Sequence, residues 1–342
     1  MATSSWNGGI IRPIPVAPAG PYSDGAASGI WTLDQVAYWT KQGLWPIAGN
    51  LPPRGLFSMG FTGAATNVIQ YITITTTGNS IDFGDVTIAR FLGASCASST
   101  RGIFGGGNGP QNTIDYVTIS TLGNATDFGD LITAFDPYGA SACGACSSST
   151  RGIFAGGNGP SNVIQYITIA SVGNATDFGD LTIARSAISS CSSSTRGVFG
   201  GGNAGGTISN VIDYITISST GNATDFGDLT EVEQYPASCS SSTRGVFAGG
   251  ATTGVVNSNV ISYITIATAG NATDFGDLVS ANQYLSACSS SIRGVFGGGN
   301  DGARTNVIQY VTIATTGNSL DFGDLLLSNQ YLSACSSAHG GL

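Results

Sequence analysis

The amino-acid sequence predicts an all-β fold, a six-bladed β-propeller, on three observations. A segment that begins Gly-Asn and contains Asp-Phe-Gly occurs six times, and an Arg-Gly pair followed by two apolar residues also occurs six times. The repeat length is close to the roughly 50 residues of one propeller blade. Each repeat divides into four short runs separated by turn residues, which is the strand content of a blade.

The two repeated markers alternate along the chain with a similar period. The leading glycines of the first marker are separated by 45, 50, 48, 49 and 47 residues. These glycines are Gly78, Gly123, Gly173, Gly221, Gly270 and Gly317. The arginines of the second marker are Arg54, Arg101, Arg151, Arg196, Arg244 and Arg293, and we expect each to order its own hairpin. A fixed period of this length favours propeller blades over helical repeats.

One repeat, from Cys191 to Leu229, shows the four expected strands. They are "SSCSSS", "RGVFGG", "NVIDYITIS" and "TDFGDL", and the third is rich in β-branched and aromatic residues. The turn "STGN" before the fourth strand supplies Gly and Asn, which accept positive φ in tight hairpins.

The triplet Asp-Phe-Gly also holds magnesium in protein kinases, which raises the possibility of a catalytic site. Six copies argue instead for a structural unit, because a substrate occupies one place. Asn124, Asp127 and Asp130 offer oxygens to calcium, yet one hairpin does not supply the roughly six to eight ligands that calcium takes. We therefore expect the aspartates to cap backbone N–H groups in the turn.

The order of the strands predicts how the ring closes. Residues 54–335 begin with a second strand, and a sixth first strand, "LSACSSA" at 332–338, follows the last "DFGDL". We expect this segment to pair with residues 54–60, so that both ends of the repeat region build one blade and no sheet edge stays open. The predicted domains are an N-terminal arm, residues 1–50, and a propeller, residues 51–342.

The run "RGVFGGG" followed by "NVIDYITI" resembles the kelch repeat, in which a glycine pair ends the second strand and a tyrosine lies in the third. The chain departs from that pattern in "TDFGDL", where phenylalanine stands in place of the usual tryptophan. The resemblance implies a kelch-like architecture and no particular activity.

Charged residues make up 9% of the chain, where roughly 25% is usual, and the net charge is −9. This balance argues against a nucleic-acid partner, which calls for a basic surface. The sequence contains no apolar stretch of about 18 or more residues, so we expect no membrane insertion. The N-terminus lacks the basic start and apolar run of a signal peptide.

The cysteines and the histidine predict no metal or cofactor. Six of the seven cysteines occupy equivalent positions, where we expect small core side chains near the propeller axis. They are Cys96, Cys146, Cys191, Cys239, Cys288 and Cys335. Cys143 makes one Cys-x-x-Cys with Cys146, which is weak evidence for zinc without a second pair. His339 is the single histidine, and we expect it at a mobile C-terminus.

The arm begins with an extended segment rich in Pro, Gly and Ala at 8–29, followed by one predicted short helix. Thr32 and Gln35 form a capping box for this helix, and Gly43 ends it. We expect the aromatic residues here to make assembly contacts. They are Trp31, Tyr38, Trp39 and Trp45.

The segment "SGIWTLDQVAYWTKQGLWP" at 28–46 is similar to one found in virion proteins of tailed phages. The "DFGDLT … CSSSTRGVFGGG" units resemble repeats in structural proteins of marine phages, especially cyanophages. The resemblance implies a non-enzymatic virion protein of the tail, a fibre or the capsid surface. It would be bound to other virion proteins through residues 1–50 and would form a homo-oligomer in the particle.

Loop variation among the repeats predicts one recognition face. The "SSSTR" and "GNATDF" turns scarcely change, whereas the loops on the opposite face differ in length and sequence. Loops on a rigid scaffold commonly carry binding residues, although sequence drift on an unused surface gives the same pattern. The candidates for contact with a host glycan or protein are Asp136, Tyr138, Glu231, Glu233, Tyr235, Tyr284, Arg304 and Tyr331. The alternative function is a glycan-binding or glycan-active protein, whose active form needs a unique set of catalytic residues in a pocket.

Overall fold

The structure is a computed structural model that describes residues 5–6, 9–10, 52–109, 111–132, 143–157 and 159–342. The chain divides into two compact units, Met1–Pro52 and Pro53–Leu342. In the first unit, β1 (Ser5–Trp6) pairs antiparallel with β2 (Gly9–Ile10). The predicted helix of the arm lies outside the described residues. The second unit is all β in its described part.

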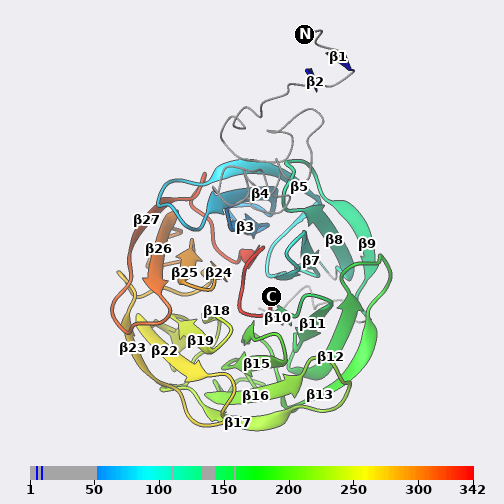
Figure 1. Cartoon of the computed structure of the whole chain (residues 1–342). Helices are drawn as coiled ribbons and strands as arrows, with labels where there is room; N and C mark the ends of the chain where they lie inside the picture. The colour runs from blue at the N-terminus through cyan, green and yellow to red at the C-terminus, as the bar shows by residue number, and fades with distance from the viewer. Residues whose placement is uncertain (1–4, 7–8, 11–51, 110, 133–142, 158) are drawn as a thin grey trace, which may run out of the picture. The chain divides into compact units, whose positions relative to one another are not determined.

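Six four-stranded antiparallel sheets surround a central axis, which confirms the predicted propeller (Figure 1). From the axis outward, blade 1 contains β28 (Ser333–Ser336), β3 (Arg54–Ser58), β4 (Thr66–Thr73) and β5 (Ile81–Arg90). Blade 2 contains β6 (Ala94–Ala97), β7 (Arg101–Gly105), β8 (Thr113–Thr118) and β9 (Thr126–Asp130). Blade 3 contains β10 (Gly144–Ser147), β11 (Arg151–Ala155), β12 (Ser161–Thr168) and β13 (Thr176–Arg185).

The remaining three blades repeat this order. Blade 4 contains β14 (Ser189–Ser192), β15 (Arg196–Gly200), β16 (Val211–Thr216) and β17 (Thr224–Asp228). Blade 5 contains β18 (Ala237–Ser240), β19 (Arg244–Ala248), β22 (Val260–Thr265) and β23 (Thr273–Asp277), with a small hairpin of β20 (Ala251–Thr252) and β21 (Val256–Asn257) between its second and third strands. Blade 6 contains β24 (Ser286–Ser289), β25 (Arg293–Gly297), β26 (Val307–Thr312) and β27 (Leu320–Asp324).

The ring closes through β28 and β3, as the strand order predicts. Ser333 pairs with Ser58, and Ser336 pairs with Gly55, in an antiparallel register. Blade 1 therefore takes its innermost strand from the C-terminal end of the repeat region and its other strands from the start. Because β28 pairs with β3, blade 1 has an innermost strand like the other five blades, and the inner edge of β3 is not exposed.

Each Asp-Phe-Gly triplet forms a β-bulge in the outermost strand of its blade. In blade 1, Ile69 pairs with Gly84 and Gln70 pairs with Asp82, so Phe83 is the extra residue. The phenylalanines of all six triplets are buried, with 2% of their surface exposed. The triplet therefore serves packing, and it turns the phenylalanine into the space between blades.

The Gly-Asn turn of the next blade crosses this bulge. The Asn124 side chain of blade 2 accepts a hydrogen bond from the backbone N–H of Asp85 in blade 1, at 3.1 Å, and the other five blade pairs repeat this contact. A Cβ atom on Gly84 would lie 2.5 Å from the carbonyl oxygen of Gly123. The backbone capping that we expected from the aspartates is thus supplied by asparagine, from the neighbouring repeat.

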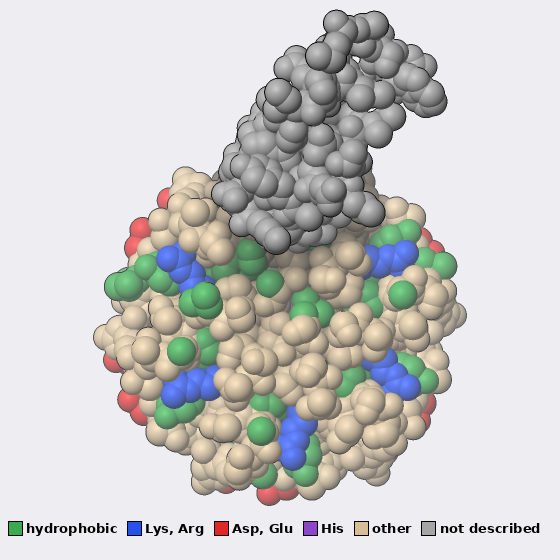
Figure 2. Space-filling view, viewed as in Figure 1, with side chains coloured by type: hydrophobic (Ala, Val, Ile, Leu, Met, Phe, Trp, Pro, Cys, Tyr) green, Lys and Arg blue, Asp and Glu red, His purple; other side chains and the backbone are tan. Residues whose placement is uncertain are grey.

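The six marker arginines also join neighbouring blades. The Arg101 guanidinium lies over the Tyr116 ring of its own blade, 4.7 Å from the centroid, and donates to the carbonyl of Ile169 in blade 3 at 2.9 Å. All six arginines make the same two contacts. We call their side of the propeller the arginine face; Figure 2 shows basic side chains in separate patches around it and acidic side chains at its rim. The arginines order the ring, beyond the single hairpin that we expected.

Near the axis, small residues let the inner strands approach one another. A Cβ atom on Gly152 would lie 2.6 Å from the Cys96 sulfur of the preceding blade, so a larger residue does not fit there. The seven cysteines are buried, and the six at equivalent positions pack in the hydrophobic core, as expected. The serine at the end of five inner strands donates to a backbone carbonyl of the preceding blade, at 2.6 to 2.8 Å.

Two buried ion pairs distinguish otherwise similar blades. Arg90 at the end of β5 contacts Asp115 of blade 2, with 2.8 Å between Nη2 and Oδ2, and Arg185 at the end of β13 pairs with Asp213 of blade 4. Both partners of each pair are fully buried. Gln70, which occupies the position of these aspartates in blade 1, accepts instead from the backbone N–H of Leu326 at 2.8 Å. The polar partner at this position thus differs from one blade junction to another.

Deleting residues 330–342 is expected to remove β28 and unmask the inner edge of β3, together with the core around Leu332 and Cys335. We expect aggregation or a large fall in melting temperature, measured by circular dichroism and size-exclusion chromatography. Deletion of residues 339–342 alone, which keeps β28, serves as the control and should cost less. If the chain that lacks residues 330–342 has the melting temperature of the full chain, closure of the ring by β28 is contradicted.

Candidate functional site

The structure describes six of the twelve predicted site residues. Asp136, Tyr138 and the assembly aromatics Trp31, Tyr38, Trp39 and Trp45 lie outside the described residues. The described six all lie on the loops opposite the arginine face, where second strands lead to third strands and blades connect. We call this side the tyrosine face. The described six are Glu231, Glu233, Tyr235, Tyr284, Arg304 and Tyr331.

The three tyrosines meet in one continuous aromatic arc. The Tyr235 and Tyr284 ring centroids are 4.7 Å apart, and those of Tyr284 and Tyr331 are 4.2 Å apart. The arc continues to Phe91, 5.7 Å from Tyr331, and to Phe61, 5.3 Å from Phe91. We define the aromatic arc as these five residues. It joins side chains at the inner strands of blades 5, 6, 1 and 2, which are distant from one another in the sequence.

The tyrosines meet because they occupy one equivalent position, four residues before the cysteine of the inner strand. Tyr235, Tyr284 and Tyr331 have φ of 58°, 61° and 61°, in the left-handed region that bulky residues rarely adopt. The equivalent residues Leu92 and Ala187 have φ of 60° and 56°. Backbone hydrogen bonds connect successive members, such as Tyr331 N–H to the Tyr284 carbonyl at 3.0 Å. This backbone strain is stored at the mouth of the axis.

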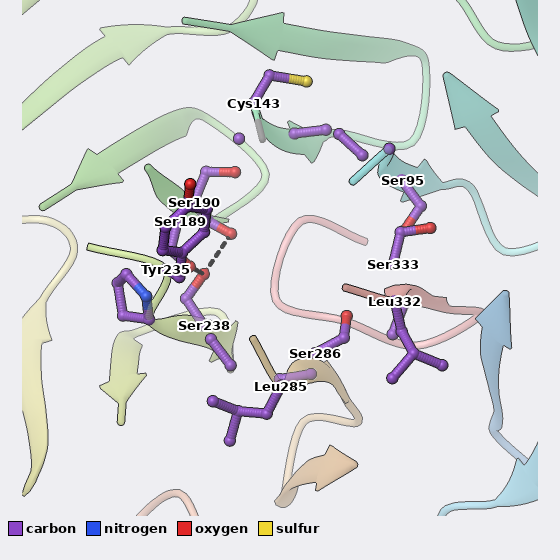
Figure 3. A pocket seen from close by; sticks show the side chains of 18 of the residues that line it. Ser95, Cys143, Ser189, Ser190, Tyr235, Ser238, Leu285, Ser286, Leu332 and Ser333 are labelled. Carbon is purple, nitrogen blue, oxygen red and sulfur yellow. Dashed lines mark hydrogen bonds between the residues drawn. The ribbon is translucent and has the colours of Figure 1, made fainter. Parts of the chain in front are cut away.

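A cavity of about 110 Å³ lies along the axis beside this arc, and we call it the axial cavity. Its lining comes from the starts of the inner strands and includes Tyr235, Tyr284 and Tyr331. Figure 3 shows serine side chains from several blades around it, with Ser189 donating to Ser238. The described lining residues are uncharged. The site thus combines aromatic rings with hydroxyl groups.

The C-terminal segment occupies the opposite end of the axis. His339 Nδ1 accepts from the Gly341 N–H at 3.1 Å, so Nε2 carries the proton and donates to the Ala97 carbonyl at 2.9 Å. Burial lowers the pKa of His339 from its ordinary value of 6.5. The expectation of a mobile histidine is wrong, because this segment is held inside the ring. A Cβ atom on Gly341 would lie 1.9 Å from the Ser147 carbonyl oxygen, so the passage is narrow.

The three charged candidates take different places. The Arg304 guanidinium lies 5.7 Å from the centroid of Phe61, at the end of the aromatic arc. Glu231 accepts a hydrogen bond from the Ser258 hydroxyl. Glu233 is only 3% exposed, and burial, with the nearby Glu231, raises its pKa well above the ordinary value of 4.5. Glu233 therefore contributes to the interior and presents no carboxylate to a partner.

Sequence reasoning missed Phe61, Phe91 and the cavity serines. Phe91 stands beside the position that holds tyrosine in blades 5, 6 and 1, so an alignment of the repeats on their cysteines points to it. Phe61 lies in the loop after β3 and bridges to Gln330, and its place follows from ring closure. The serines repeat in every inner strand, and the sequence alone does not separate those that line a cavity from those that bond neighbouring strands.

Among the described residues, no group of three or more His, Cys, Asp or Glu side chains is arranged to hold a metal ion. That same part of the chain has no helix long and apolar enough to cross a membrane. No protein-family model matches the chain, and no curated protein shows significant sequence similarity to it.

Replacing Glu233 with Gln is expected to stabilise the protein at neutral pH. Because the folded-state pKa of Glu233 is raised, the stability that it contributes is present below pH 4.5 and is lost as pH rises through the folded pKa. The melting temperature of Glu233→Gln should therefore exceed that of the parent chain by a margin that grows from pH 4.5 to pH 8.

Two further variants check this result. Glu233→Asn introduces the residue that stands at this position before the inner strands of blades 6 and 1, as Asn282 and Asn329, and should behave similarly. Asp301→Asn removes an exposed carboxylate and should leave the melting temperature nearly constant. A margin for Glu233→Gln that does not change with pH would show that Glu233 is ionised inside the fold.

Proposed function

We propose that this protein is a non-enzymatic structural component of a tailed-phage particle, which presents its propeller to the host surface. In this proposal residues 1–50 attach it to other virion proteins, and the tyrosine face contacts a host glycan or protein. It is located in the virion as a homo-oligomer. The resemblance of residues 28–46 and of the repeats to marine phage proteins supports this assignment.

The aromatic arc is the observation that carries the recognition role. Five aromatic residues gather on the face whose loops differ most among the blades, whereas the turns of the arginine face remain nearly uniform. Aromatic side chains are enriched where proteins bind partners, because they supply a large contact area with little conformational freedom to lose. A rigid ring that displays variable loops is suited to a binding module.

The repeated acidic motif supports a non-catalytic role. The six Asp-Phe-Gly triplets form bulges between blades, and their aspartates lie toward the rim, away from the axial cavity. The first aspartate of each triplet is solvent-exposed, as Asp82 illustrates. The architecture explains the repeated phenylalanine and glycine of the triplet, and the six exposed aspartates are spread around the rim, so they do not converge on one substrate.

The virion role predicts the behaviour of a chain that begins at Leu51. Because the repeats close on themselves through β28 and β3, this shorter chain should fold and melt as the full chain does. It should fail to join the oligomer or the particle, as measured by its abundance in purified virions after complementation. Incorporation at the normal level would place the attachment contacts outside residues 1–50.

The recognition role predicts that replacing Tyr235, Tyr284 and Tyr331 together with Ala weakens attachment to host cells. Ala187 occupies the equivalent left-handed position in blade 4, so alanine is compatible with the backbone. Because Tyr235 is buried against Leu92 and Ala187, the melting temperature of the variant is measured alongside attachment. Loss of several aromatic contacts should weaken binding roughly tenfold or more, since about 1.4 kcal/mol changes affinity tenfold. Attachment of labelled protein to a panel of cyanobacterial strains measures the effect.

The matched control removes apolar side chains from the arginine face. Leu122, Val172 and Ile292 are 57%, 59% and 64% exposed, and their replacement with Ala should leave attachment unchanged. Full attachment by the tyrosine variant, with its fold intact, would exclude the tyrosine face as the recognition surface. An equal loss in both variants would indicate nonspecific adhesion through exposed apolar groups.

A further inference from the structure

We propose that the axial cavity is a binding site for an uncharged sugar, the terminal residue of a neutral glycan, which enters from the tyrosine face. This inference rests on the proposed function, because it names the ligand class of the same face. Three features of the described residues support it: unused hydroxyl groups, aromatic rings beside them, and the absence of charge in the described lining.

The residues that line the cavity include serines whose hydroxyls form no hydrogen bond within the fold. The hydroxyls of Ser190 and Ser333 are buried and form no hydrogen bond with another described residue, and Ser286 also lines the cavity. A buried hydroxyl without a partner costs free energy, so such groups indicate that a polar molecule completes the site. The volume of about 110 Å³ exceeds the roughly 10–15 Å³ that one water molecule requires.

The tyrosines place aromatic surface against the same space. Tyr235, Tyr284 and Tyr331 line the cavity, and each presents an apolar ring with one hydroxyl. A sugar ring has the complementary character, since it carries hydroxyls at its edge and apolar C–H groups on its faces. Pockets for small ligands commonly combine aromatic surface with a few placed polar groups. The left-handed φ of these tyrosines shows that the backbone holds them there at a conformational cost.

The electrostatics favour an uncharged ligand. The described lining contains no Asp, Glu, Lys, Arg or His side chain. At the other end of the axis, His339 is neutral in the hydrogen-bonding arrangement with Ala97 and Gly341. An ionised ligand would leave water for a site without an opposite charge, which is unfavourable. A neutral hydroxylated ligand needs only the hydroxyl and backbone partners that are present.

The C-terminal segment gives the axis one closed end. His339, Gly340 and Gly341 lie against the inner strands, and Gly340 N–H donates to the Ser240 carbonyl at 3.0 Å. A ligand that enters from the tyrosine face therefore meets a blocked passage. This geometry is suited to the end of a glycan chain, because an internal residue would need openings on both sides.

Binding of free monosaccharides to the full-length protein tests the proposal. The probes are D-glucose, D-galactose, D-mannose and N-acetylglucosamine, with glucuronate and N-acetylneuraminate as charged comparisons, observed by saturation-transfer NMR and by tyrosine fluorescence. We expect saturable binding of at least one neutral sugar and weaker binding of both acids. No binding of any neutral sugar, or preferential binding of an acid, would overturn the proposal.

Variants locate the bound sugar. Ser286→Leu fills the cavity and should weaken binding at least about tenfold, the equivalent of about 1.4 kcal/mol. Ser219→Leu, at an exposed turn of the arginine face, is the matched control and should bind normally. Because Leu at 286 can disturb the inner strand, the double variant Ser190→Ala and Ser333→Ala removes two unpaired hydroxyls without adding volume, and it should weaken binding several-fold. Unchanged binding by both the filled and the double variant would place the sugar elsewhere.

The outcomes separate this inference from the proposed function. If the tyrosine variant loses host attachment while the intact protein binds no neutral sugar, the recognition role stands and the sugar assignment is wrong. If neutral sugars bind the cavity but the chain beginning at Leu51 joins particles normally, the sugar site stands and attachment through the arm is wrong.

Discussion

The whole ring depends on the passage of one blade's Gly-Asn turn over the Asp-Phe-Gly bulge of the blade before it. At Gly84 the carbonyl of Gly123 comes so close that a side chain has no room, and Asn124 then caps the freed backbone N–H of Asp85. A bulge leaves a local gap in the ladder of its own strand, and the neighbouring blade fills that gap. The motif is therefore half of a contact whose other half lies in the next repeat.

Contacts between blades must also keep similar blades in order. The marker arginines and the bulges are the same in all six repeats, so they stabilise any neighbour equally. The buried Arg90–Asp115 and Arg185–Asp213 pairs join particular junctions, because a blade that carries glutamine at the aspartate position would leave a buried arginine unpaired. Breaking such a pair costs roughly 3–5 kcal/mol, more than the pair itself contributes over an apolar substitute. The penalty falls on wrong neighbours, which favours the correct order of blades.

The sequence was sufficient to predict the architecture, but it did not predict most of the hydrogen-bond partners of individual side chains. Six copies of four apolar runs predicted the strands, and a count of first and second strands predicted the pairing of β28 with β3. The same pattern did not reveal that Asn124 accepts a hydrogen bond from blade 1, or that Arg101 donates one to blade 3. Periodicity describes the content of a single repeat, whereas these hydrogen bonds join different repeats. Glu233 looked like a surface acid for a related reason: it is buried where its backbone bonds Gly202 and Ser209, which lie more than 20 residues earlier, and the local sequence does not show this contact.

The two faces differ in how many of their side chains form the contacts that hold the blades together. On the arginine face the guanidinium, the tyrosine under it and the next blade's carbonyl form one unit, so a change to any of them loosens a blade junction. On the tyrosine face the second-to-third loops mostly bond to adjacent loops; Asn203, for example, bonds Gln234, and Asn300 bonds Gln330. Such contacts can be exchanged in pairs without disturbing the sheets, which explains why the loops vary there while the strands beneath them do not. The aromatic arc lies where these variable loops meet the rigid inner strands, and new recognition chemistry is added at the lowest structural cost at that boundary.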